Sequence, residues 1–491
     1  MSNEQTEGLR KRAQSVTRAE EIKDVEKKVR RKQPDKPCHQ PRDSLFSWTS
    51  GFTQFTGFVN WGFLLLSIGG LRLFLENFIK YGIRIDPIQW LYILSGKDDD
   101  GAGHPSVVLI LYSNVPIVFC ILVEKGISVE IIPQAIGMFT HVANLLALII
   151  LPMVVIHVQD GFSFIGASLV STLYSVLFLK LWSYVQVNLW CRTARQQHKS
   201  TLRRSSLSSN NLPDCGETNG KKQLQDKKTK DKENELVNYP DNLTLKDLYY
   251  FLFAPTLCYE LNFPKTDRIR KRFLLKRIVE VILGFQLILC IIQQYMIPSV
   301  KNSLIPFSNL DYARSMERLL KLAMPNHLAW LCMFYILFHS WLNLLGEILH
   351  FADRSYYSDW WNSTNIDSFW RTWNLPVHRW CLRHLYLPMV EMGYNKNVAA
   401  TTVFFLSAFF HEYLVSVPLK TYKIWAFMGM MGQIPLSSIS RSIEKKYGPR
   451  CGNIVVWASL IIGQPLAIMM YYHDYIVDHY GKVLIEDFGR V

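Results

Sequence analysis

The amino-acid sequence predicts an all-α polytopic membrane protein with about nine transmembrane helices, and three observations carry this prediction. Of the 491 residues, 49% are hydrophobic and only 19% are charged, below the roughly 25% that is typical of soluble domains. Several apolar stretches of about 18 to 25 residues are long enough to cross the hydrocarbon core of a bilayer. The basic residues behind the net charge of +14 concentrate in tails and loops, which favours cytoplasmic segments of a membrane protein over nucleic-acid binding.

The apolar stretches divide the chain into two membrane regions with polar segments around them. We predict a disordered basic cytosolic tail (1–45), four transmembrane helices within 46–191, a disordered cytosolic linker (192–238), five transmembrane helices within 239–480 and a short luminal tail (481–491). The tail and linker contain too few large apolar residues to build a core. The spans are placed near residues 57–79, 106–124, 132–157, 163–187, 277–298, 325–349, 398–418, 423–440 and 453–475.

The charges of the loops predict the orientation. With a cytosolic amino terminus, four crossings return the chain to the cytosol at the Lys-rich linker, and the basic segment 441–450 falls on the same side, as the positive-inside rule expects. The ninth crossing then leaves the carboxyl terminus in the lumen. Two glycosylation sequons, at Asn242 and Asn362, lie on the predicted cytosolic side, so we expect neither to carry a glycan.

One histidine, His411, lies deep in the apolar stretch TTVFFLSAFFHEYLVSVPL. An ionisable side chain within a membrane span is costly and usually has a function or faces a polar cavity. Helical periodicity puts Ser407 and Ala408 on the same face, where small side chains would leave room for a substrate chain. Glu412 points about 100° away and is a poor orienting partner, while Gln464 adds a polar group in a later span. This feature alone fits a catalytic histidine and a structural one equally well.

The segment 354–396 interleaves tryptophans with Arg and Lys on the predicted cytosolic side. Such a composition suits an interfacial amphipathic helix. It also suits a surface that binds an anionic, aromatic headgroup such as that of CoA, because adenine can stack on aromatic rings and phosphates pair with arginines. If the segment is helical as far as Pro376, then Trp370, Trp373 and Asn374 share one face.

The stretch YYSDWWN at 356–362 resembles the F-Y-x-D-W-W-N motif of the acyl-CoA:sterol and diacylglycerol acyltransferase branch of the membrane-bound O-acyltransferase family. Tyr356 stands where Phe is usual and keeps the ring. Residues 239–277 and the segments ERLLKLAMPNHL, WNLPVHRWCLRHLY, SAFFHEYLVSVPL and IIGQPLAIMMYYHDY are similar to members that use diacylglycerol, and the resemblance runs from about residue 44 to 478. The motif residues are Tyr356, Tyr357, Asp359, Trp360, Trp361 and Asn362.

This resemblance implies helices that enclose an intramembrane reaction chamber, an endoplasmic-reticulum membrane location, a cytosolic amino terminus and a homodimer or homotetramer. It implies that 239–480 is the catalytic region and that the substrates are acyl-CoA and diacylglycerol, with acyl-CoA a co-substrate. No cofactor, metal or nucleic acid is expected. The implied catalytic residues are His411, Asn374, Glu412 and Gln464. The implied acyl-CoA contacts are Trp370, Trp373, Asn374, His378, Tyr386, Lys396 and Ser407.

The resulting hypothesis is an acyltransferase that moves the acyl group directly from the thioester to diacylglycerol, giving triacylglycerol. Neutral His411 would act as general base, and Asn374 or Gln464 would donate to the oxyanion. A sterol acceptor remains open, because the motif does not distinguish the two alcohols. A polytopic transporter with His411 as an intramembrane relay is an alternative of another class, and a non-catalytic lipid-binding scaffold is a third. No GxSxG elbow or HExxH helix supports a hydrolase.

Overall fold

The computed structural model describes residues 56–79, 105–159, 161–208 and 236–481, together with Pro34, Ser44, Leu45, Ser47 and Gln54. Most of the predicted amino-terminal tail, the later part of the predicted linker and nearly all of the predicted luminal tail lie outside the described residues. Within the described ranges the chain is helical, and its one extended pairing is an isolated antiparallel bridge between Lys265 and Phe351. The predicted all-α class is confirmed for this part of the chain.

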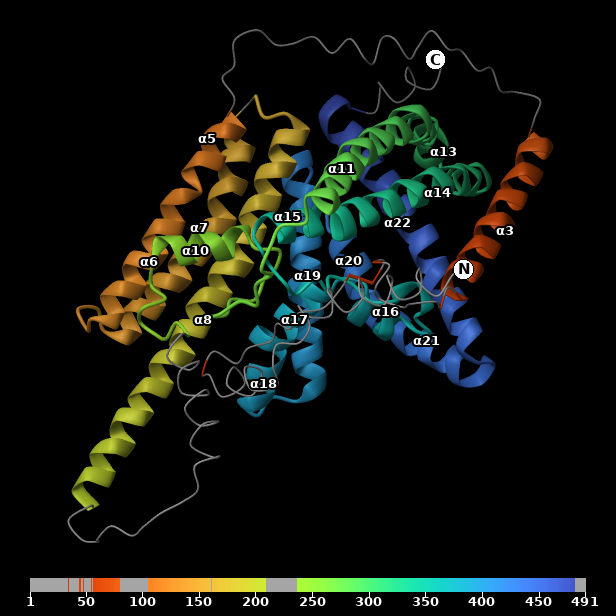
Figure 1. Cartoon of the computed structure of the whole chain (residues 1–491). Coiled ribbons are helices and arrows are strands. Elements are labelled where there is room, and N and C mark those ends of the chain that lie inside the picture. Colours follow the sequence, from red (N-terminus) through yellow and green to blue (C-terminus); the bar gives the residue numbers. More distant parts are fainter. Residues whose placement is uncertain are drawn as a thin grey trace.

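Four helices that follow one another in the sequence form the first group (Figure 1). They are Pro105–Tyr112 (α5), Asn114–Ser128 (α6), Gln134–Val158 (α7) and Phe164–Ser208 (α8). Side chains such as Leu148, Ile156 and Leu181 are buried between them, while the remaining apolar surface suits contact with lipid. The three spans predicted here are confirmed. α8 continues to Ser208, so residues 192–208 are helical and the predicted start of the linker at 192 is wrong.

The second group contains the remaining long helices, with α19 placed against α8 of the first group (Figure 1). π-helical turns at Ile292–Met296 and Tyr335–Trp341 continue α11 into α12 and α14 into α15. The bounds are Thr56–Ile79 (α3), Lys271–Ile291 (α11), Ile297–Lys301 (α12), Leu304–Ser308 (α13), Tyr312–Phe334 (α14), Leu342–Ile348 (α15), Lys396–Leu419 (α19), Trp425–Met431 (α20), Gln433–Tyr447 (α21) and Pro449–Tyr480 (α22).

Six helical segments in the described ranges are long and apolar enough to cross a membrane: 105–128, 134–158, 164–197, 312–348, 396–419 and 449–480. They confirm a polytopic membrane protein, and the number nine stays a prediction. The predicted span 423–440 is not one helix, because α20 ends at Met431 and α21 begins at Gln433. Pro435 lacks the N–H that would bond back across this junction.

Short elements connect the long helices. They are Leu245–Phe253 (α10), a 3₁₀ turn at Trp360–Asn362, Ile366–Thr372 (α16), Leu375–Cys381 (α17), a π-helical turn at Leu382–Tyr386 and Leu387–Glu391 (α18). Thr244, Asn365 and Asn374 cap α10, α16 and α17 by accepting a backbone N–H with their side chains. The segment 354–396 is therefore not a single helix as far as Pro376, since Asn374 begins a new one.

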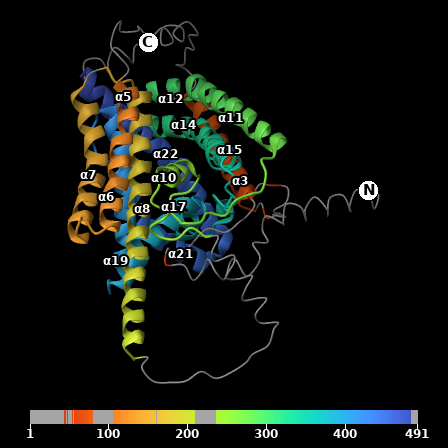
Figure 2. The same ribbon diagram turned by 60° about the vertical axis from the view of Figure 1, so that its left-hand side comes forward.

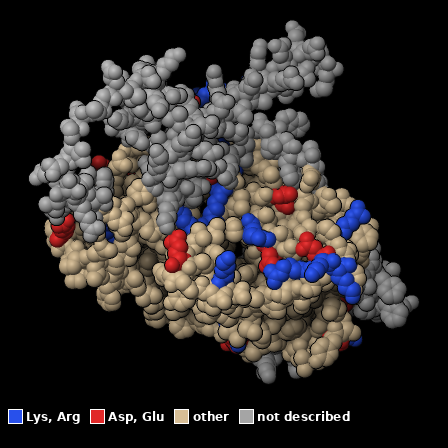
Figure 3. All heavy atoms as spheres, turned by 90° about the horizontal axis from the view of Figure 1, so that it is seen from below, with Lys and Arg blue, Asp and Glu red and all other residues tan. Residues whose placement is uncertain are grey.

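Charged side chains gather on the face seen from below Figure 1, where Figure 3 shows Lys and Arg together with some Asp and Glu. Exposed Arg441, Lys445, Lys446 and Arg450 lie at the junction of α21 and α22. α8 also extends toward this end of the molecule (Figures 1 and 2). The positive-inside rule assigns this basic face to the cytosol. The sidedness of the protein stays a prediction.

Candidate active site

His411 lies in the second half of α19, and the preceding turn of the helix orients its ring. The ring Nδ1 is 2.7 Å from the backbone carbonyl oxygen of Ser407 and 3.5 Å from the Ser407 hydroxyl oxygen. A carbonyl oxygen can only accept, so Nδ1 carries the proton and Nε2 keeps its lone pair in the neutral ring. The ring is exposed. The helix therefore presents a basic nitrogen to the space beside it.

The tryptophans predicted to contact acyl-CoA link α16 to the helix that carries His411. The rings of Trp370 and Trp373 are 6.2 Å apart between centroids and nearly perpendicular. Trp370 reaches Phe404 of α19, 6.5 Å away, and Trp373 stacks on Trp330 of α14 at 6.0 Å. Phe404 precedes His411 by two helical turns on the same face, a separation of about 10 Å. The aromatic group therefore adjoins the face of α19 that bears the histidine.

Glu412 connects three helices. Its carboxylate accepts hydrogen bonds from the Tyr471 hydroxyl, 2.8 Å from each oxygen, and from the backbone N–H of Phe427 at 3.0 Å. The Ser416 hydroxyl is a further donor. These partners lie in α22, α20 and α19, so both carboxylate oxygens are used in holding the helices together. The described contacts do not join Glu412 to the imidazole, which agrees with the poor orienting geometry expected from the sequence.

Gln464 lies in the middle of α22 and is partly buried. It precedes Tyr471 by seven residues, which places both on one helical face, and Tyr471 is the residue bonded to Glu412. The Gln464 Oε1 accepts a hydrogen bond of 3.3 Å from the Asn326 amide of α14. With its oxygen engaged in this way, the Gln464 amide nitrogen is directed toward other acceptors.

Asn374 caps a helix with its side-chain oxygen and keeps its NH₂ group for other acceptors. Its side-chain oxygen accepts the backbone N–H of Val377 at 3.2 Å and so caps α17. Because a backbone N–H can only donate, the amide oxygen must face Val377 and the NH₂ group must point elsewhere. Asn374 thus retains two N–H donors. It begins α17 and does not continue α16, so the condition under which it would share a helix face with Trp370 and Trp373 is not met.

His378 lies in α17, Tyr386 ends the π-helical turn, and Lys396 is the first residue of α19, beyond α18. His378 is partly buried, and burial followed by the charges of Arg371 and Arg379 lowers its pKa. Lys396 is exposed. The described contacts do not join these side chains to His411, so their contact with acyl-CoA stays a prediction.

His384 fixes the π-helical turn against α8. Its Nε2 is 2.8 Å from the Ser183 hydroxyl and its Nδ1 is 2.9 Å from the Gln186 side-chain oxygen. Ser183 already accepts the backbone N–H of Tyr259 at 2.7 Å, so its own proton points to Nε2. The imidazole also stacks on Trp190 at 5.6 Å. Sequence reasoning missed this residue, because nothing in the local pattern distinguishes it from its neighbours in the Trp- and Arg-rich segment.

The aromatic residues of the motif are buried, not presented to a substrate. Tyr356, Tyr357, Trp360 and Trp361 are between 0% and 3% exposed. The Tyr357 hydroxyl lies 2.8 Å from Nδ1 of His339 in the π-helical turn that follows α14, and Asp359 accepts a hydrogen bond from Ser358. The described contacts place none of these side chains on His411.

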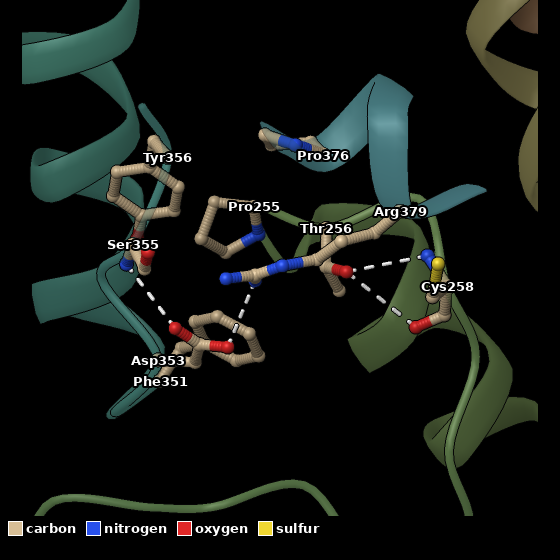
Figure 4. A pocket seen from close by; sticks show the side chains of 9 residues that line it. All are labelled: Pro255, Thr256, Cys258, Phe351, Asp353, Ser355, Tyr356, Pro376 and Arg379. Atoms are coloured by element: carbon tan, nitrogen blue, oxygen red, sulfur yellow. Dashed lines mark hydrogen bonds and ion pairs between the residues drawn. The ribbon is translucent and has the colours of Figure 1, made fainter. Parts of the chain in front are cut away.

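A small pocket lies between the 255–258 loop, the 351–356 segment and the start of α17 (Figure 4). An ion pair of 3.0 Å between Arg379 and Asp353 crosses it. Its lining includes Tyr356 of the motif but none of the predicted catalytic or acyl-CoA residues. We therefore assign it no part in the reaction.

Buried charges in the first helical group were also missed by sequence reasoning. The Lys180 ammonium donates to three backbone carbonyl oxygens at the end of α10, at 2.8 to 2.9 Å. Glu124 pairs with Arg192 and lies 3.1 Å from Nε2 of His141. A charged residue within an apolar stretch was the available signal for Lys180 and Glu124.

Comparison with known proteins supplies the family. Residues 131–473 match the model of the membrane-bound O-acyltransferase family. The chain is 48% identical over 450 residues to "Diacylglycerol O-acyltransferase 1" of Homo sapiens, covering 91% of this chain and 86% of that protein. It is 36% identical over 455 residues to "Diacylglycerol O-acyltransferase 1A" of Glycine max, with 92% and 84% covered. For "Diacylglycerol O-acyltransferase 1" of Dictyostelium discoideum the identity is 35% over 440 residues, with 89% and 65% covered.

These matches extend over both helical groups and include the helix that carries His411. The expected resemblance is confirmed by the match over 131–473 and by the identity to the human protein. The chain belongs to the membrane-bound O-acyltransferase family.

Proposed function

We propose that this chain is an acyl-CoA:diacylglycerol O-acyltransferase that makes triacylglycerol by direct transfer, with His411 as general base. The orientation of the imidazole carries the proposal: Nδ1 donates to the Ser407 carbonyl oxygen at 2.7 Å, which leaves Nε2 as the basic atom. The relatives named diacylglycerol O-acyltransferase, which align over about nine-tenths of the chain, support the choice of substrates.

The reaction needs one base and no covalent enzyme intermediate. Nε2 takes the proton of the diacylglycerol hydroxyl while the oxygen attacks the thioester carbonyl carbon. The C–S bond then breaks, and the imidazolium returns the proton to the departing CoA sulfur, so the histidine ends neutral. Such general-base assistance contributes about 10² to 10⁴ in rate. Holding both lipids beside one helix face lowers the entropic cost of their encounter.

The oxyanion of the tetrahedral intermediate requires hydrogen-bond donors. Asn374 and Gln464 are the candidates, because each has its amide oxygen engaged by another group and retains an NH₂. One such donor contributes about 3 kcal/mol of transition-state stabilisation. Glu412 holds α19 against α20 and α22 through its hydrogen bonds from Phe427 and Tyr471.

The acyl-CoA would lie along the face of α19 that Trp370 adjoins through Phe404. In this proposal Trp370, Trp373, His378, Tyr386, Lys396 and Ser407 contact it. The enzyme resides in the endoplasmic-reticulum membrane as a homodimer or homotetramer, with a cytosolic amino terminus and a luminal carboxyl terminus. The basic face at the junction of α21 and α22 then meets the anionic CoA on the cytosolic side.

The test is product analysis with purified protein. Labelled acyl-CoA is supplied with diacylglycerol or with a sterol, and the products are separated by thin-layer chromatography. We expect labelled triacylglycerol and no sterol ester. His411→Ala should abolish the product while acyl-CoA binding persists. His157→Ala, at the end of α7, is the matched control and should stay active.

Three outcomes would count against the proposal. Full activity of His411→Ala would remove the general base. Sterol ester as the main product would favour the sterol alternative. Solute flux across sealed vesicles with no new ester would favour the transporter.

A further inference from the structure

The carboxyl-terminal part of the YYSDWWN motif lies at the start of α3. The backbone N–H of Gly57, in the first turn of α3, donates to the side-chain oxygen of Asn362 at 2.6 Å. The Asn362 NH₂ donates to the carbonyl oxygen of Gln54 at 2.7 Å, and the Trp361 indole N–H donates to the same oxygen at 3.2 Å. Asn362 therefore satisfies a free N–H at the amino end of α3 from 305 positions away in the sequence.

The same turn is bonded to the start of α22. Asn453 is buried, and its NH₂ donates to the carbonyl oxygens of Trp361 at 2.9 Å and Ser363 at 2.8 Å. Because both partners are carbonyl oxygens, the Asn453 side-chain oxygen must face the other way. There it accepts the side-chain N–H of Asn60 in α3 at 2.7 Å. The hydrogen bonds close a ring that runs from α3 through the motif to α22 and back.

Two glycines allow this close approach. A Cβ atom on Gly57 of α3 would lie 1.3 Å from the carbonyl oxygen of Trp361. A Cβ atom on Gly452 of α22 would lie 1.8 Å from the carbonyl oxygen of Thr364. Both obstacles are backbone atoms, which cannot move aside as a flexible side chain can. Each helix thus meets the 361–364 turn at a position where only glycine fits.

Aromatic packing extends the contact toward the proposed reaction centre. Phe58 of α3 lies 4.9 Å from Trp361, and Trp61 lies 6.1 Å from Trp457 of α22. Trp457 precedes Gln464 by two turns on the same face of α22. The position of α3 is therefore linked to the part of α22 that carries one of the candidate oxyanion donors.

We propose that residues 361–363 of the motif form a joint that seats α3 against α22, and that this seating positions Gln464. The helix α3 lies before the residues that match the family model, 131–473. Asn362 is a positioning residue and touches no substrate. The second half of the proposal rests on the proposed function, whereas the seating of α3 does not.

Hydrogen–deuterium exchange of the purified full chain measures the seating directly. Asn362→Ala removes two hydrogen bonds that hold the start of α3, so amides in residues 54–60 should exchange about tenfold faster. Asn362→Asp keeps an acceptor for the Gly57 N–H and places a negative charge at a helix amino terminus, where it is favourable. It cannot donate to the Gln54 carbonyl oxygen, so it should restore the protection of α3 only in part.

Asn365→Ala is the matched control. Asn365 is also a capping asparagine, three residues further along, but it caps α16 and bonds to Glu444. Its loss should leave exchange in α3 unchanged. If Asn362→Ala exchanges like the wild type in residues 54–60, the joint is refuted, whatever the enzyme does.

Kinetics test the second half of the proposal. With the seating lost, Asn362→Ala should reduce kcat by about tenfold while KM for acyl-CoA changes little, since the α16 tryptophans keep their packing. Asn362→Asp should recover kcat in part. Faster exchange with unchanged kcat would refute the positioning of Gln464 and leave the joint standing.

Discussion

Replacing Tyr471 by Phe tests whether Glu412 acts as a tie between helices. The hydroxyl donates to the Glu412 carboxylate, 2.8 Å from each oxygen, and accepts the backbone N–H of Ala426 at 2.9 Å. Removing it leaves the ring in place and removes the hydrogen bonds from Tyr471 to α19 and α20, while the bond between Trp425 and Asp474 still joins α20 to α22. The carboxylate keeps its bonds from Ser416 and Phe427, so no unpaired charge is created.

The expected cost follows from the bonds lost. A hydrogen bond to a charged group contributes about 1.5 to 3 kcal/mol, and a neutral one about 1 kcal/mol. Tyr471→Phe should therefore destabilise the fold by roughly 3 kcal/mol. At about 2 °C per kcal/mol for a large chain, the Tm should fall by about 6 °C.

Thermal unfolding in detergent at a fixed scan rate measures this shift. Tyr472→Phe is the matched control, because the described contacts include no hydrogen bond of the Tyr472 hydroxyl. The Tm of this variant should stay within about 2 °C of the wild-type value. Activity assayed below the transition should be reduced but present. An unchanged Tm for Tyr471→Phe, together with complete loss of activity in Glu412→Gln, would refute the tie and give the carboxylate a chemical role.

Three further changes have expected outcomes. Burial raises the pKa of Asp247 from 3.8 to about 6. The folded chain therefore keeps a proton that the unfolded chain releases, and its stability falls as the pH rises from about 4 to 6. Asp247→Asn should remove this pH dependence of the Tm. Burial lowers the pKa of His378, so stability should fall as pH drops below about 6.5, and His378→Gln should flatten that acid limb of the Tm profile. Lys180→Met leaves three carbonyl oxygens at the end of α10 without their donor. It should lower the yield of folded protein in size-exclusion chromatography. The control Lys396→Met, at an exposed position, should not lower this yield.

The structure gives a reason why the two sequon asparagines, Asn242 and Asn362, should carry no glycan. Asn242 is 1% exposed, and its NH₂ donates to Asn188 at 2.9 Å and to Tyr259 at 3.0 Å. The nitrogen that a glycan would occupy is already enclosed by α8. The NH₂ of Asn362 is likewise bonded to Gln54. A glycan on Asn242 is therefore incompatible with this fold as well as with the predicted topology.

Helix positions were predictable to within a few residues where apolar length alone sets them. The stretch predicted near 398–418 is α19 at Lys396–Leu419, and 132–157 is α7 at Gln134–Val158. Helix boundaries were missed where a polar side chain begins a new helix, as at Asn374, or where proline interrupts the bonding, as at Pro435. The continuation of α8 to Ser208 was also missed, since a polar composition does not forbid a helix.

The sequence by itself determined the membrane-spanning class, the family and the histidine in α19, because apolar length and linear motifs are local properties of a chain. It also placed Ser407 one turn before His411, and that local contact orients the ring. Only the tertiary structure decided which distant polar groups meet: Glu412 with Tyr471, Gln464 with Asn326, and Asn362 with Gly57. A hydrogen bond forms over about 3 Å, and whether two residues far apart in the sequence come that close depends on how the helices pack, which no local pattern records.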